Sequence, residues 1–189
     1  MIQLRLASNE LYTISEMGQM AVEGGCGWLV ISMPGAEPGA WRDVAEELVP
    51  LCRDAGVMLS VENDIDAVRE FGAHGVYLTP GANPAKVRED LGAEAIIGAG
   101  IASADSAVAL ARADIDYLTL APGVDCSIIG DARKGGAEVP FVAVVTAGAL
   151  LADYSGYIEK GFDGFYVTDG VFDTDDPVSA VRNLISLTK

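Results

Sequence analysis

Four acidic side chains come at or just after the ends of apolar segments, and together they could hold a divalent cation. Glu62 and Asp64 belong to the cluster Glu62-Asn63-Asp64, while Asp125 and Asp169 follow later apolar runs. Carboxylate oxygens are the ligands that Mg²⁺ prefers. We therefore take Glu62, Asp64 and Asp169 as candidate metal ligands. The alternative is that such acids cap the helices that follow them. Capping is the better interpretation for Asp64, and both interpretations stay open for Glu62.

Few basic side chains could meet an anionic substrate. The chain has 12 Lys and Arg residues against 28 Asp and Glu residues, a formal net charge of −16, and most of the basic residues fall on predicted helices. Arg133 and Lys134 lie in residues 125–138, a stretch with three glycines that we expect to be a mobile lid. They are our candidate catalytic residues, although Lys134 could equally be a solvated surface lysine.

The elements that position these side chains are clearest in residues 56–80. Residues 57–61 are apolar or β-branched at most positions, which predicts a strand. Ile65, Val68 and Phe71 then recur at three-residue spacing, as one buried helix face requires. Residues 75–79 form a second predicted strand. A connection of this length between two strands predicts a parallel βαβ unit.

Comparable units occur along the whole chain. The predicted strands are residues 2–7, 27–32, 57–61, 75–79, 95–99, 116–121, 141–145 and 163–168. The other predicted helices are residues 15–22, 41–55, 86–91, 105–112, 149–160 and one that begins at Pro177. A repeat of about 20–25 residues predicts an α/β protein with a single (β/α)₈ TIM barrel domain over residues 1–189. An open doubly wound sheet fits less well, because no glycine-rich dinucleotide loop follows the first strand.

In such a barrel the chemistry lies where the strands end. The candidate substrate-binding residues are the polar and glycine residues at those ends: Ser32, Asn63, Thr79, Gly100, Thr146, Gly148, Thr168 and Gly170. The single histidine, His74, precedes a strand and therefore lies at the opposite face, where we expect a structural role.

Composition excludes several classes of partner. The acidic balance argues against nucleic acid and anionic lipid, which both need a basic face. No apolar run reaches the ~18 residues of a membrane span, and the first residues do not resemble a secretory signal. Cys26, Cys52 and Cys126 are an odd number without CxxC spacing. They predict free thiols in a reducing cytoplasm.

Several segments resemble thiamine phosphate synthase and its thiazole tautomerase relatives. They are NDIDAVREFGAHGVYL, DLGAEAIIGAG, ADIDYLTLAPGV, VPFVAVVTAG and GFDGFYVTDGVFDTDDPVSAV. The resemblance runs in order from about Gly27 to the C-terminus. It implies a single parallel barrel and a small phosphorylated ligand held by the loops after strands 7 and 8. It also implies Mg²⁺ and the coupling of an aminopyrimidine diphosphate to a thiazole phosphate in thiamine biosynthesis.

The family's motifs at the first strand ends are changed in this chain. The Gln-Leu-Arg-x-Lys run that ends strand 2 in the family is replaced by Ile31-Ser32-Met33-Pro34-Gly35. Gln3-Leu4-Arg5 has the same first letters but lies about one βα unit too early, so we do not assign it that role. The family's Asn-Asp-Arg after strand 3 falls on Glu62-Asn63-Asp64, where the arginine is absent.

The later motifs also differ. Thr79-Pro80 stands in place of Gly-Gln, and Gly100 in place of a serine. Asp169 replaces the serine of the strand-8 phosphate loop and would meet a phosphate with like charge. Lys134 is the nearest equivalent of the family's phosphate-contacting lysine in the strand-6 loop.

Three hypotheses remain. The first is a thiamine phosphate synthase with a redrawn site, with Glu62 and Asp64 on Mg²⁺ and Arg133 and Lys134 on diphosphate. The second is a non-catalytic barrel of the same family that binds a small ligand or a protein partner. The third is an enzyme of another reaction with an acidic, metal-binding mouth. We favour a member whose synthase activity is weak or lost. The partners we expect are a small phosphorylated molecule and a second copy of the chain in a homo-oligomer.

Overall fold

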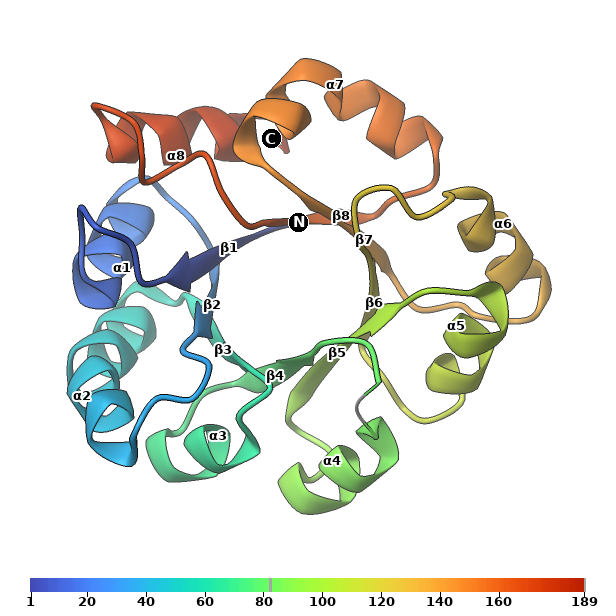
Figure 1. Cartoon of the computed structure of the whole chain (residues 1–189), viewed down its shortest axis with the longest axis horizontal. Helices are drawn as coiled ribbons and strands as arrows, with labels where there is room; N and C mark the ends of the chain where they lie inside the picture. Colours follow the sequence, from blue (N-terminus) through green and yellow to red (C-terminus); the bar gives the residue numbers. More distant parts are fainter. Residues whose placement is uncertain (82, 189) are drawn as a thin grey trace.

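Eight parallel strands form a closed barrel in the computed structural model, which describes residues 1–81 and 83–188 (Figure 1). The strands are β1 (Ile2–Ala7), β2 (Trp28–Ser32), β3 (Met58–Glu62), β4 (Gly75–Leu78), β5 (Ile96–Ile101), β6 (Tyr117–Leu120), β7 (Phe141–Val145) and β8 (Gly164–Val167). Each strand pairs with its neighbour in sequence. The pairing of β1 with β8, which sets Ile2 opposite Phe165 and Leu4 opposite Val167, closes the ring.

A helix follows each strand and packs on the outside of the ring (Figure 1). The helices are α1 (Ile14–Glu23), α2 (Pro38–Ala55), α3 (Ile65–Phe71), α4 (Pro84–Leu91), α5 (Ala104–Ala111), α6 (Ser127–Lys134), α7 (Ala147–Glu159) and α8 (Pro177–Ser186). This is the single (β/α)₈ TIM barrel that the repeat predicts.

The loop predicted as a lid over residues 125–138 is in fact largely helical. That stretch contains α6, whose Ile129 and Ala132 are buried against the barrel. Asp125 orders the entry to the helix, because its carboxylate accepts hydrogen bonds from the backbone N–H and the hydroxyl of Ser127. Because its apolar pattern is short and has glycines on both sides, the sequence gives only a weak helix signal here.

Helix ends follow ordinary capping chemistry. The carboxylates of Asp64 and Asp176 accept backbone N–H groups at the starts of α3 and α8, so the capping interpretation of Asp64 is confirmed. Gly72 ends α3 with φ 73°, a left-handed conformation that favours glycine. Pro50 does not end α2, which continues to Ala55.

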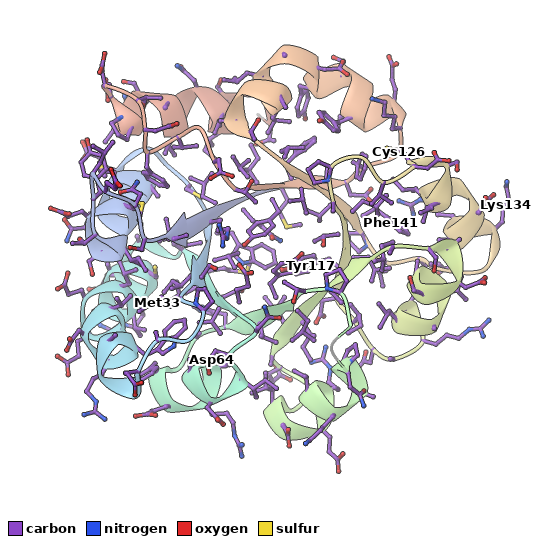
Figure 2. The ribbon with its side chains drawn as sticks, viewed as in Figure 1. Met33, Asp64, Tyr117, Cys126, Lys134 and Phe141 are labelled. Atoms are coloured by element: carbon purple, nitrogen blue, oxygen red, sulfur yellow. The ribbon has the colours of Figure 1, made fainter. Side chains whose placement is uncertain are left out.

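The buried side chains form two clusters, as a barrel requires. The larger lies between the strands and the surrounding helices, and includes Phe141, Leu118 and Leu150. The smaller fills the barrel interior with the aromatic residues Trp28, Tyr77, Tyr117 and Tyr166 together with Val30 and Val142. Figure 2 shows Tyr117 near the centre of the ring and Phe141 outside it, towards α6. The barrel is therefore a packed core and not a pore.

Gly98 on β5 leaves the space that the Tyr117 ring fills. A Cβ at this position would overlap the ring directly. Tyr117 has no freedom to withdraw, because its side chain is fully buried and packs edge-on against Trp28 with the ring centroids 5.4 Å apart. The large side chain of Tyr117 thus packs where Gly98, on the neighbouring strand, has no side chain.

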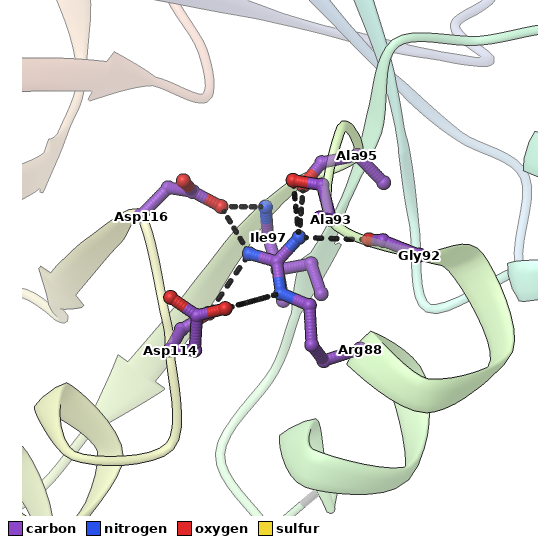
Figure 3. A network of polar contacts seen from close by, with 7 residues as sticks. All are labelled: Arg88, Gly92, Ala93, Ala95, Ile97, Asp114 and Asp116. Carbon is purple, nitrogen blue, oxygen red and sulfur yellow. Dashed lines mark hydrogen bonds and ion pairs between the residues drawn. The ribbon is translucent and has the colours of Figure 1, made fainter.

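At the other end of the barrel, Arg88 ties α4 to the starts of β5 and β6 (Figure 3). Its guanidinium donates to the backbone carbonyls of Gly92, Ala95 and Asp114 and to the Asp116 carboxylate at 2.7 Å. The same carboxylate accepts the backbone N–H of Ile97. The Arg88 side chain is only 13% exposed, while the side chain of Asp116 is 44% exposed.

The three cysteines are free, and two of them give the stability a pH dependence. Burial raises the pKa of Cys26 to about 11 and that of Cys52 to about 11. The unfolded chain then loses thiol protons at lower pH than the folded chain. We expect the free energy of unfolding to fall by about 2 kcal/mol for each thiol, and so by about 4 kcal/mol for the two, as the pH rises from 9 to 11.

Urea denaturation at pH 8 and pH 10.5 measures this effect. The double variant Cys26→Ala/Cys52→Ala should lose part of the pH dependence, while Cys126→Ala, at a half-buried position, should keep it. If the free energy of unfolding changed equally between the two pH values in both variants and in the unchanged protein, the buried thiols would not be responsible.

Within residues 1–81 and 83–188, no helix is both long and apolar enough to span a membrane.

Candidate functional site

An ion pair lies across the barrel mouth, at the carboxyl ends of the strands. Nε of Arg5 on β1 donates to Oε2 of Glu62 on β3 at 3.1 Å. Nη2 of Arg5 donates to Oγ of Ser32 on β2 at 2.8 Å. The hydroxyl of Tyr166 on β8 donates to the same Glu62 oxygen at 3.2 Å. Side chains from four strands therefore form one hydrogen-bonded network around this ion pair.

Sequence reasoning missed the role of Arg5. The chain does carry a signal, because Gln3 and Arg5 alternate with Ile2, Leu4 and Leu6 along β1. The apolar set faces the helices, so the polar set must face the barrel interior. The long Arg5 side chain then reaches up to the mouth, where it is 28% exposed.

The tyrosines below the ion pair stay protonated. Burial, and after it the negative charge of Glu62, raises the pKa of Tyr166. Burial also raises the pKa of Tyr77, whose hydroxyl lies 3.0 Å from Oγ1 of Thr119. Tyr166 is therefore a fixed donor to Glu62, and it holds the carboxylate in the orientation that Arg5 needs.

At β3 and β4 the predicted site residues bind one another. Oδ1 of Asn63 accepts the backbone N–H of Thr79 at 2.9 Å and its hydroxyl at 3.1 Å. Gly100 is covered, because a Cβ there would lie 2.6 Å from Cδ of Pro80. All three residues lie at the mouth, but Asn63 and Thr79 are hydrogen-bonded to each other and Gly100 is covered by Pro80.

At β7 and β8 four predicted residues come together. The Thr146 hydroxyl accepts the backbone N–H of Ala149 and caps α7, whose first turn contains the exposed Gly148. The hydroxyl of Thr168 donates to a backbone carbonyl of β7. Gly170 has φ 85° and lies against the start of α7. A Cβ built on Gly170 would be 3.8 Å from the backbone nitrogen of Gly148. These loops meet where TIM barrels commonly bind phosphate.

The expected position of Arg133 and Lys134 at the mouth is wrong. Both lie at the C-terminal end of α6, and Lys134 is at the periphery in Figure 2. Arg133 pairs at 2.9 Å with Asp163, whose carboxylate also accepts the backbone N–H of Phe141, the first residue of β7. That is the end opposite the mouth, because a helix returns the chain to the amino ends of the strands. His74 is at this end too, where Nδ1 accepts the backbone N–H of Leu59, as expected of a structural residue.

The three predicted metal ligands do not fit a Mg²⁺ site. Glu62 already accepts from Arg5 and Tyr166, and Asp64 caps α3. Asp169 lies on the loop after β8 with its side chain exposed. In the described part of the chain no three Asp, Glu, His or Cys residues are grouped so that they could hold a metal ion.

The fold and the mouth define a TIM barrel with a polar site at the carboxyl ends of its strands. The family model for thiamine monophosphate synthase matches residues 7–147. The chain belongs to this family.

Two curated relatives and one solved structure show how far the similarity extends. Thiamine-phosphate synthase of Bacteroides fragilis is 27% identical over 98% of this chain and 98% of its own length. That of Natronomonas pharaonis is 31% identical over 90% of this chain and 85% of its own. Thiamine phosphate pyrophosphorylase from Pyrococcus furiosus matches the fold with a TM-score of 0.82 at 21% identity, covering 98% of this chain and 94% of that protein.

Proposed function

We propose that this chain is a member of the thiamine monophosphate synthase family that binds a small ligand at the barrel mouth and has little or no synthase activity. The observation that carries the proposal is the closed network of Arg5, Glu62, Ser32 and Tyr166. In this network the Arg5 guanidinium at the mouth is paired with the Glu62 carboxylate, so neither group is free for a diphosphate or a metal ion.

The reaction chemistry explains why this network matters. Loss of diphosphate from an aminopyrimidine diphosphate needs positive charge or a metal ion around the leaving oxygens. Here the charge of Arg5 is compensated by Glu62, and the two partners are held 3.1 Å apart. Asp169 adds a negative charge at the β8 loop, where a phosphate would have to approach. The charges at the mouth therefore disfavour binding of a polyanion.

A second candidate is a working synthase with Arg5 in place of the missing family arginine. The β7 and β8 loops favour it, because Gly148 and Gly170 retain a compact backbone frame at the usual phosphate position. The curated relatives named thiamine-phosphate synthase also align over nearly the full length. In this case the Arg5–Glu62 pair would have to separate when substrate binds.

A turnover assay separates the two candidates. Purified protein is mixed with Mg²⁺, the aminopyrimidine diphosphate and the thiazole phosphate, with the Bacteroides fragilis synthase as the positive control. We expect no thiamine phosphate above the rate without protein. Product that is lost in Arg5→Gln but kept in the matched variant Arg42→Gln, an exposed helix position, would establish the second candidate instead.

The setting we propose is the cytoplasm, whose reducing conditions suit three free thiols. Association into a homo-oligomer stays a prediction.

A further inference from the structure

A cavity of about 210 Å³ lies beside the Arg5–Glu62 pair, between β1 and β8. Its polar lining comes from Arg5, Ser8, Asn9, Thr168, Asp169 and Asp173, and Phe172 and Met17 form an apolar wall. A space of this size suits a compact molecule with few heavy atoms.

Arg5 has donors left for such a molecule. Its guanidinium carries five N–H groups, and the contacts to Glu62 and Ser32 use two of them. Nη1 makes no hydrogen bond with any residue that the structure describes. Because Glu62 and Ser32 fix the guanidinium plane, the remaining N–H groups are already oriented to bind a carboxylate.

The other charged groups of the lining are negative. Asp169 and Asp173 are exposed acids on the loop after β8, and neither carboxylate is hydrogen-bonded or ion-paired within residues 1–81 and 83–188. Their charge opposes a phosphate or a diphosphate and favours a cationic group. Thus the cavity has a donor for an anion on its β1 side and acceptors for a cation on its β8 side.

We propose that this cavity binds a small zwitterion, with the carboxylate on Arg5 and the ammonium group facing Asp169 and Asp173. The inference rests on the proposed function, because a mouth adapted to a zwitterion is one that no longer serves diphosphate transfer. It names the ligand class as an amino acid or a similar aminocarboxylate of short chain length.

Calorimetry with simple probes tests the proposal. The zwitterions are 3-aminopropionate, 4-aminobutyrate and 6-aminohexanoate, and the matched probes are butyrate, butylamine and inorganic diphosphate. We expect at least one zwitterion to bind about tenfold or more tightly than any of these three, since each charged contact supplies a charge-assisted hydrogen bond. Diphosphate binding more tightly than every zwitterion, or no zwitterion binding, would overturn the proposal.

Two variants locate the contacts. Arg5→Gln should weaken zwitterion binding about tenfold or more. Because that change also leaves Glu62 without its partner, the exposed pair Asp169→Asn/Asp173→Asn gives an independent test. It should weaken binding of the zwitterion and leave binding of butyrate equal or stronger. Unchanged zwitterion binding in both variants contradicts the proposal. Binding is measured without turnover, so thiamine phosphate formation would contradict the proposed function separately.

Discussion

Replacing Arg88 by methionine is expected to lower the free energy of unfolding by about 2 kcal/mol. Methionine keeps much of the length and apolar surface of the side chain but none of its donors. The carbonyls of Gly92, Ala95 and Asp114 then lose their partner, and the Asp116 carboxylate loses its counter-charge. Since these groups join α4 to β5 and β6, the loss affects three elements at once (Figure 3).

Urea denaturation followed by circular dichroism measures this difference. The matched control is Arg42→Met, because Arg42 pairs with Glu70 at 3.4 Å while its side chain is 60% exposed. We expect a change within about 0.5 kcal/mol for the control, as for most surface ion pairs. Similar values for the two variants would mean that the Arg88 network contributes no more than an exposed pair does.

Replacing Gly98 by alanine is expected to cost about 2–3 kcal/mol, because the added methyl group overlaps the Tyr117 ring. The barrel interior cannot relax easily around it. Tyr117 packs edge-on against Trp28, and the indole of Trp28 is itself held by a hydrogen bond to Ser60. The strain therefore passes into a cluster of side chains that are all buried.

Two further proteins make the test specific. Gly27→Ala adds the same methyl group where nothing lies within 4 Å, and it should change stability by no more than about 0.5 kcal/mol. The double variant Gly98→Ala/Tyr117→Leu should lose less stability than the sum of its single changes, because leucine vacates the ring position. Additive losses would show that the Gly98 methyl group does not contact Tyr117.

The barrel itself was predictable from local patterns. Apolar strands of β-branched residues alternate with segments such as Ile65, Val68 and Phe71, and capping residues such as Asp64 and Asp176 mark the helix starts. These signals depend on neighbours a few residues apart, so they can be read along the chain. The helix α6 escaped because its eight residues carry too short an apolar pattern between glycines.

The site was predictable only in part. The sequence alone determined which residues end the strands, and Thr146, Gly148, Thr168 and Gly170 do meet at the mouth. Only the tertiary structure decided the charges there. The curled sheet brings Arg5 on β1 within 3.1 Å of Glu62 on β3, 57 residues further along the chain, and the direction of α6 places Arg133 at the opposite end. Strand alternation sets the direction of each side chain, but the packing of the strands around the barrel sets its partner, because electrostatic pairing depends on distance in space.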